Sequence, residues 1–69
     1  MKEFKLEGGE FIALCDLMKA SHLTESGGVA KHLIAEGQVK VDGAVELRKR
    51  CKIRVGQVVE FQGKQVKVI

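Results

Sequence analysis

The spacing of the apolar residues changes at Gly37, and this change limits the folds that the chain can adopt. Before Gly37, apolar side chains recur three and four positions apart, as in residues 14–18 and 30–34. After it they alternate with polar side chains, beginning with Val39 and Val41. The first spacing is typical of helices with one buried face, and the second of half-buried strands. The sequence therefore predicts helices before Gly37 and a sheet after it.

Two short helices are predicted, over residues 14–20 and 27–36. Ser26 precedes the second helix and is a good N-cap, because its hydroxyl can accept a hydrogen bond from an unpaired N–H of the first turn. Gly37 is expected to end this helix in the left-handed conformation that glycine tolerates.

Three strand pairs complete the predicted fold, and each is joined by a turn that contains glycine. The pairs are residues 4–6 with 11–13, residues 39–41 with a return strand through Val45 and Leu47, and residues 58–61 with 65–69. The turns are Gly8-Gly9, Asp42-Gly43 and Gly63-Lys64, of which Asp-Gly is the strongest hairpin signal. The predicted fold class is α+β, with two short helices packed on a short, mostly antiparallel sheet.

Size and composition favour one domain that acts through its surface. With 69 residues, 45% of them hydrophobic, the chain is too short for two cores and too apolar for a disordered tail. A chain of this size buries only about 60% of the surface that it exposes when unfolded, so a deep pocket would compete with the core for apolar side chains. We expect one domain over residues 1–69, with no catalytic residue, no cofactor and no small-molecule substrate.

The positive charge is concentrated in the second half of the chain. Residues 1–30 carry three lysines against five acids, a net charge of −2, whereas residues 31–69 carry nine basic residues against four acids, a net charge of +5. This asymmetry favours a polyanionic partner, with nucleic acid first and an anionic membrane surface second. No stretch free of Asp, Glu, Lys and Arg exceeds five residues, so neither a membrane span nor a signal peptide is expected.

The two cysteines form no recognisable metal or disulfide motif. Cys15 and Cys51 lack the CxxC spacing of a zinc site, and two unpaired thiols suit a reducing cytoplasm. Cys15 with His22 or His32 would formally allow nucleophilic catalysis, so a small thiol hydrolase or redox protein is one alternative function. A thiol between Leu14 and Leu17 on a short helix is more often a buried core group, which is the interpretation we favour.

The strongest charge cluster is the segment 48–54, with five basic residues in seven positions. If this segment is extended, alternate side chains share a face. The cations Arg48, Arg50, Lys52 and Arg54 would then point one way, and Cys51, Ile53 and Val55 the other. Cations roughly 6.5–7 Å apart resemble the spacing of successive phosphates, and arginine can bind phosphate at two points. The alternative is a solubilising edge that prevents sheets from aggregating.

Gly27 and Gly28 form a second candidate phosphate site at the start of the second predicted helix. Glycine is unfavourable within a helix, so its presence there needs a reason. Bare glycines would let a phosphate approach the unpaired N–H groups, where the helix dipole also favours an anion. Lys31, Gln38 and Lys40 would extend the basic face. The alternative is that the glycines only permit close packing against the first helix.

Aromatic side chains are scarce, and this favours one mode of nucleic-acid recognition. The chain has only Phe4, Phe11 and Phe61, all of which we expect in the core. Readers of single-stranded nucleic acid usually stack bases on exposed rings. The sequence therefore favours recognition of folded RNA through its backbone and shape.

Residues 26–43, which read SGGVAKHLIAEGQVKVDG, resemble the signature of the S4-type RNA-binding domain. That signature has a serine, a basic pair, Leu-Ile and then Gly-x-Val-x-Val-Asn-Gly. The chain is similar in particular to the stand-alone bacterial YbcJ-type proteins, over about residues 10–69, with the signature region at 26–54. Gly27 stands where the family has a basic residue, which removes one phosphate contact. Asp42 replaces asparagine in a turn that accepts both.

The resemblance implies an αL motif, in which two helices and a loop pack on a short sheet and lay a basic face on structured RNA without catalysis. It favours ribosomal RNA, a ribosome-assembly intermediate or a tRNA-like RNA, bound by a cytoplasmic monomer. The expected contacts are Ser26, Gly27, Gly28, Lys31, His32, Gln38, Lys40, Arg48, Lys49, Arg50, Lys52 and Arg54. For His32, a solvated surface position is an equal alternative. A different function left open is a protein-interaction adaptor that uses residues 66–69 as an exposed strand edge.

Overall fold

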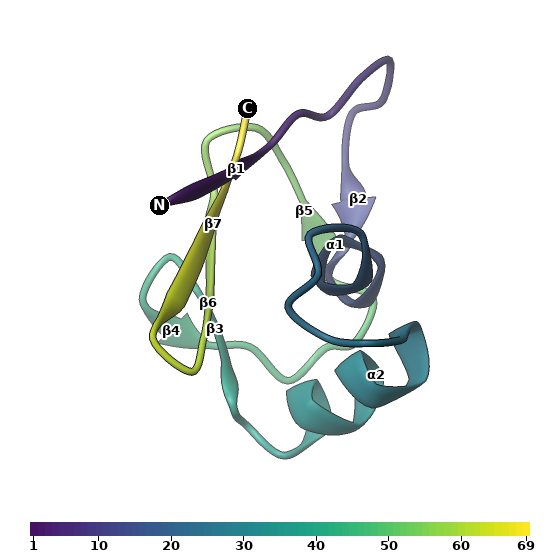
Figure 1. Ribbon diagram of the computed structural model, residues 1–69, viewed down its shortest axis with the longest axis vertical. Helices are drawn as coiled ribbons and strands as arrows, with labels where there is room; N and C mark the ends of the chain where they lie inside the picture. The colour runs from purple at the N-terminus through teal and green to yellow at the C-terminus, as the bar shows by residue number, and fades with distance from the viewer.

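Two short helices pack against each other beside a five-stranded sheet and a two-stranded sheet (Figure 1). The computed structural model describes all 69 residues. The helices are α1 (Leu14–Ala20) and α2 (Gly27–Ala35). The strands are β1 (Lys2–Phe4), β2 (Ile12–Ala13), β3 (Val39–Val41), β4 (Ala44–Val45), β5 (Lys52–Ile53), β6 (Val58–Phe61) and β7 (Lys64–Val68). The predicted α+β class is confirmed.

The large sheet has the strand order β1-β7-β6-β3-β4, and the small sheet consists of β2 and β5. Only β1 and β7 are parallel, and every other pair is antiparallel. The sheet is therefore mostly antiparallel, as predicted.

Both predicted helices are confirmed, although α2 ends one residue earlier than predicted. The Ser26 hydroxyl accepts a hydrogen bond of 3.2 Å from the backbone N–H of Val29, so this serine is the expected N-cap. Gly37 takes a φ of +78° just after the helix, where a side chain would be strained. Neither helix has the length and apolar character that crossing a membrane requires.

The hairpin at Asp42-Gly43 is confirmed as the turn between β3 and β4. Asp42 and Gly43 have φ values of +51° and +84°, which fits the type I′ turn that Asp-Gly favours. The return strand is shorter than predicted, because the chain leaves the sheet after Val45 to reach α1. Val45 and Leu47 are both exposed.

The predicted hairpin around Gly8-Gly9 is wrong. β1 instead runs parallel to β7, with Phe4 opposite Val68, and β2 pairs with β5. Two further backbone hydrogen bonds of 2.9 Å extend the contact between the two ends of the chain. The Leu6 N–H donates to the Ile69 carbonyl, and the Ile69 N–H donates to the Phe4 carbonyl. The connection from β1 to β2 extends away from the rest of the molecule (Figure 1). Long-range pairing thus prevails over a local turn signal.

The C-terminal strand is not an exposed edge. β7 lies between β1 and β6, and its Val66 and Val68 are fully buried. The turn before it falls on Gln62-Gly63 instead of Gly63-Lys64, with φ values of +53° and +77° that again fit a type I′ turn. The free edges of the large sheet are β1 and β4, so an adaptor that docks partners along β7 is contradicted by the topology.

One apolar core joins the helices to both sheets. It contains Ala13, Leu14, Cys15, Leu17, Met18, Ala30, Ile34, Val39, Val41, Ile53, Val59, Phe61, Val66 and Val68. Cys15 is fully buried, as predicted. The expectation for Phe11 is wrong, since this residue is 41% exposed. Phe11 precedes β2, at the end where the chain enters from the projecting connection, and lies outside the core.

Candidate nucleic-acid interface

The basic segment 48–54 begins with a turn, whereas the sequence predicted continuous extended chain. The Cys51 N–H donates a hydrogen bond of 3.1 Å to the Arg48 carbonyl, which closes a turn over residues 48–51. The side chains of Arg48 and Arg50 are therefore presented by a turn instead of by one face of a strand.

Strand alternation holds only over residues 52–54. Ile53 is fully buried, while Lys52 and Arg54 on either side of it are exposed. The expectation that Val55 points into the core is wrong, because this residue is 63% exposed. The chain turns at Gly56, whose φ is +96°, before the alternation can continue.

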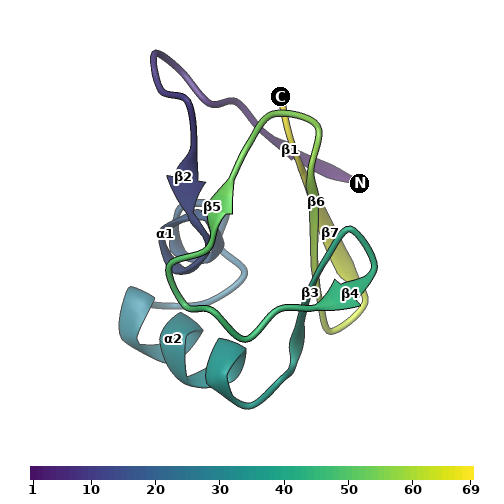
Figure 2. The ribbon, with the colours of Figure 1, turned by 180° about the vertical axis from the view of Figure 1, so that it is seen from behind.

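The backbone of the basic segment is fastened to the first turn of α1. The Leu14 N–H donates to the Cys51 carbonyl over 2.9 Å, and the Cys15 N–H donates to the Lys49 carbonyl over 3.1 Å. These two N–H groups have no partner within the helix, so the loop acts as a cap. In Figure 2 the segment between β4 and β5 runs from the large sheet past α2 to α1 and β2. The cations therefore project from a fixed backbone.

Four cations of this segment form no ion pair within the protein. They are Lys49, Arg50, Lys52 and Arg54, and all four are exposed. Arg50 and Lys52, with Arg48 and Cys51, line a shallow hollow of about 550 Å³. The Arg54 backbone N–H donates to the Gln57 side-chain oxygen over 2.8 Å, and its guanidinium lies 3.5 Å from the Glu10 carbonyl. Unpaired cations around a hollow attract anionic ligands.

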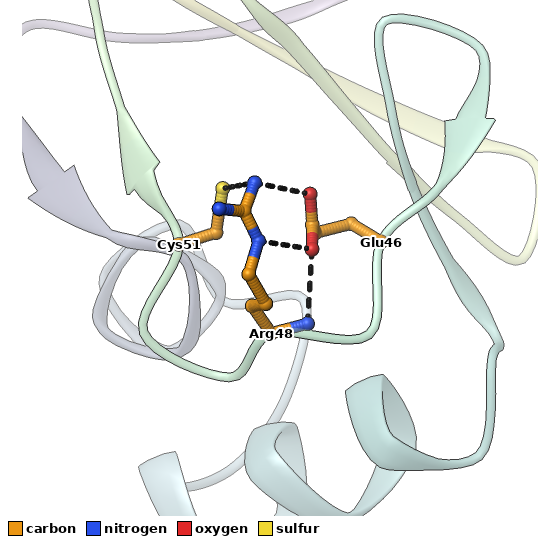
Figure 3. Close-up of polar contacts among 3 residues, drawn as sticks. All are labelled: Glu46, Arg48 and Cys51. Carbon is orange, nitrogen blue, oxygen red and sulfur yellow. Dashed lines mark hydrogen bonds and ion pairs between the residues drawn. The ribbon is translucent and has the colours of Figure 1, made fainter.

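Arg48 differs from the other cations because Glu46 binds it (Figure 3). Glu46 Oε2 accepts from Arg48 Nε over 3.0 Å and from the Arg48 backbone N–H over 2.9 Å, while Oε1 accepts from Nη2 over 3.2 Å. The hydrogen bonds from Arg48 lower the pKa of Glu46 from 4.5 to about 2, and those to Glu46 raise the pKa of Arg48. Glu46 was not among the residues predicted from the sequence, although its position two residues before Arg48 is a signal of the pair.

The thiols are unsuited to nucleophilic chemistry. Burial, and then the nearby Glu46 carboxylate, raise the pKa of Cys51, so this thiol stays protonated near neutral pH. Its sulfur lies 3.6 Å from Arg48 Nη2, as Figure 3 shows. Cys15 is fully buried, and its thiol contacts the carboxylate of Asp16 at 3.8 Å. This geometry does not support a thiol hydrolase.

The first turn of α2 is open to solvent. A Cβ at Gly27 would meet no atom within 4 Å, and at Gly28 it would meet only the Ser26 hydroxyl at 3.8 Å. The alternative that these glycines permit close packing against the first helix is therefore wrong. The Val29 N–H is bonded to the Ser26 hydroxyl, which leaves the N–H groups of Gly27 and Gly28 for a phosphate.

Glu36 engages two of the predicted contacts on α2 and just after it. His32 Nε2 lies 3.2 Å from Glu36 Oε2, and Gln38 Nε2 donates to Glu36 Oε1 over 3.0 Å. Neither contact of Glu36 was predicted from the sequence, although an i,i+4 spacing on a helix permits the His32 pair. His32 and Gln38 are thus less available to a ligand than Lys31, which is exposed and unpaired.

Lys40 lies on β3, apart from the basic segment in sequence. It is exposed, and its cross-strand neighbours are Val45 on β4 and Glu60 on β6. A Cβ on Gly37, at the end of α2, would lie 3.7 Å from Leu47 and 3.8 Å from Val45. The end of α2 and the start of the basic segment are therefore neighbours, whereas Lys40 is not among the residues that line the hollow.

The helical pair, the capping loop and the short sheet are the parts of an αL-motif domain, and a model of the S4 domain family matches residues 4–69. The chain belongs to the S4 domain family. It is 56% identical over 69 residues to "Putative RNA-binding protein YbcJ" of Escherichia coli (strain K12), with 100% of this chain and 99% of that protein covered.

A more distant relative and a solved structure extend the comparison. The chain is 37% identical over 54 residues to "Probable ribosome maturation protein RlbA" of Bacillus subtilis (strain 168), which covers 78% of this chain and 76% of that protein. The solution structure of YbcJ from E. coli, described as revealing an αL motif involved in RNA binding, matches with a TM-score of 0.78. That match has 56% identity and covers 100% of this chain and 87% of the other. The resemblance and the αL-motif fold predicted from the sequence are confirmed.

Proposed function

We propose that this protein binds structured RNA through the phosphate backbone and takes part in ribosome assembly. The observation that carries the proposal is the set of four unpaired cations on a loop fastened to α1. Cations on a backbone that is held in place suit a ligand whose phosphates are also fixed, because neither backbone then loses much conformational entropy on binding. The names of the two relatives, one for RNA binding and one for ribosome maturation, support this function.

The twelve residues predicted from the sequence are proposed to contribute unequally. Lys49, Arg50, Lys52 and Arg54 are the principal phosphate ligands, because they are exposed, unpaired and on one segment. Lys31 and Lys40 add charge, and the open turn from Ser26 to Gly28 offers backbone N–H groups. Arg48, His32 and Gln38 bind only after their glutamate partners release them.

The proposal also covers the domain extent, the location, the oligomeric state and the ligand. The chain acts as a single S4-like domain over residues 1–69, in the cytoplasm, as a monomer and without catalysis. Ribosomal RNA or a tRNA-like RNA is the proposed ligand. The raised pKa of Cys51 and the burial of Cys15 support a function that needs no nucleophile.

Fluorescence anisotropy with two RNAs tests the function. A ribosomal-type hairpin should bind at least about fivefold more tightly than poly(U) of equal length, since a prefolded RNA has already lost the entropy that a loose strand must lose. The logarithm of the affinity should fall with log[salt] at a slope of about −3 to −4, because several cations displace counterions. Equal binding of both RNAs would reduce the protein to a nonspecific polyanion binder, and a slope near zero would exclude phosphate binding.

A DNA duplex of the same sequence as the hairpin stem is the matched control. The 2′-hydroxyl and the wide minor groove distinguish the RNA helix from the DNA helix. We expect weaker binding to the DNA, and equal binding would remove any role for the 2′-hydroxyl.

A further inference from the structure

Phe11 is an exposed aromatic ring next to two of the proposed phosphate ligands. The Lys52 ammonium lies 4.9 Å from the centroid of the ring, and the Arg54 guanidinium carbon lies 5.7 Å from it. The pairing of Ile12 with Ile53 places Phe11, which precedes β2, level with Arg54, which follows β5. The small sheet thus gathers one ring and two cations at a single place.

Packing within the protein does not account for the position of this ring. Phe61 is 6% exposed and Phe4 packs against the core, whereas Phe11 remains 41% exposed. A cation near an exposed ring contributes little to stability, since water solvates the charge almost as well. Phe11 therefore holds apolar surface in water, beside the surface proposed to bind RNA.

We propose that Phe11 stacks on an unpaired base of the bound RNA, while Lys52 and Arg54 bind the phosphates that flank this nucleotide. The proposal rests on the function proposed above and deepens it, because it makes a bulge or loop beside a stem the preferred ligand. Unpaired bases in folded RNA commonly stack on aromatic side chains. Residues at positions i and i+2 of a strand lie roughly 6.5–7 Å apart, a separation that suits the two phosphates on either side of one nucleotide.

The two cations fit this role because both are free of carboxylates. In the unbound protein Lys52 and Arg54 rest near the ring, and the flanking phosphates compete with the ring for them when RNA binds. Movement of the cations toward the phosphates uncovers the ring for the base. Ring and cations therefore act together on a single nucleotide.

Three hairpins that share one stem test the proposal by anisotropy. The first carries a single bulged adenosine, the second carries an abasic nucleotide at that position, and the third is fully paired. The wild-type protein should bind the bulged hairpin about tenfold more tightly than the abasic one, which is the scale of one base–aromatic stack. Phe11→Leu should bind these two hairpins equally, and Phe4→Leu, the matched control, should retain the preference.

The outcomes separate stacking from two other results. If Phe11→Leu weakens binding to all three hairpins by the same factor, the ring only orders the cations and the stacking proposal is overturned. If the wild-type protein binds the fully paired hairpin with the expected salt dependence but shows no preference for the bulge, stacking fails while the proposed function stands. If no hairpin is bound, the proposed function fails as well.

A fluorescent variant gives a second test that does not depend on affinity. The chain has no tryptophan, so Phe11→Trp introduces a single indole. Stacking should quench its fluorescence with the bulged hairpin and leave it almost unchanged with the abasic hairpin. Val55→Trp, at an exposed position next to Arg54, is the control for mere proximity to RNA. Equal quenching by both hairpins at position 11 would overturn the proposal.

Discussion

The carboxylate of Glu46 binds the guanidinium of Arg48 at two points, with oxygen–nitrogen distances of 3.0 Å and 3.2 Å. The same two nitrogens would bind a phosphate in that two-point manner. Glu46 therefore competes with RNA for Arg48, and the basic segment presents one cation fewer than its sequence suggests.

Replacement of Glu46 by glutamine should release this cation. We expect Glu46→Gln to bind a hairpin RNA roughly three- to tenfold more tightly, with the salt slope steeper by about 0.7 to 0.9, the effect of one more phosphate contact. Anisotropy titrations over a range of salt concentrations measure both quantities. Glu3→Gln, on β1, makes the same change in net charge far along the chain from the basic segment. If both variants bind equally tightly, the gain comes from net charge alone.

The Glu46–Arg48 pair should also make stability depend on pH in the acid range. The pKa of Glu46 is lowered from 4.5 to about 2 in the folded protein, so the pair stabilises the fold fully above pH 4.5 and is lost as pH falls toward 2. The difference in melting temperature between the wild type and Glu46→Gln should be constant from about pH 8 to 5 and shrink below that. Circular dichroism melts measure this difference in melting temperature. A difference that stays undiminished at about pH 2 would contradict the lowered pKa of Glu46.

Arg50 and Ile53 should separate binding from folding. Arg50 is exposed and unpaired, so Arg50→Glu should weaken RNA binding by about tenfold or more and change the melting temperature by only a few degrees. Ile53 is fully buried, and Ile53→Glu should unfold the domain, since an unpaired buried charge costs on the order of several kcal/mol. Anisotropy measures the RNA affinity of both variants, and thermal melts on the same samples measure their stability. Unfolding of Arg50→Glu would show that this side chain supports the turn.

The first turn of α2 offers a variant with opposite effects on stability and binding. Gly28 has space for a methyl group, with only the Ser26 hydroxyl at 3.8 Å, and its φ is not positive. Gly28→Ala should therefore stabilise the free protein by about 0.4–1 kcal/mol by restricting the unfolded chain. Its RNA affinity should fall by roughly fivefold, because the methyl group keeps a phosphate from the backbone N–H groups. Unchanged or tighter RNA binding would remove this turn from the interface.

Local patterns predicted the helices and the β3–β4 hairpin well, because short-range interactions determine these elements. The Ser26 cap, the Gly37 terminus and the Asp42-Gly43 turn each depend on residues within a few positions. The N-terminal hairpin was predicted wrongly because β1 finds its partner at the other end of the chain. No local pattern reveals such a pairing.

The sequence predicted which charged residues make up the candidate site, but not which of them are bound by carboxylates. Sequence spacing identified the basic segment, yet it missed the turn at its start and the carboxylates that engage Arg48 and His32. Phe11 was assigned to the core because it begins an apolar stretch, and its exposure results from its place at the outer end of the small sheet. Which cations remain free is a property of the folded chain.

The pairing of β1 with β7 determines when the domain can finish folding. Contacts between residues 2–4 and 66–68 close a loop of nearly the whole chain, which is entropically unfavourable until other structure exists. The contacts between α1 and α2 join segments that are close in sequence, so we expect the helical pair to form first. During synthesis on the ribosome, the large sheet stays incomplete until residues 64–68 have emerged, because both β1 and β6 need β7 as their neighbour.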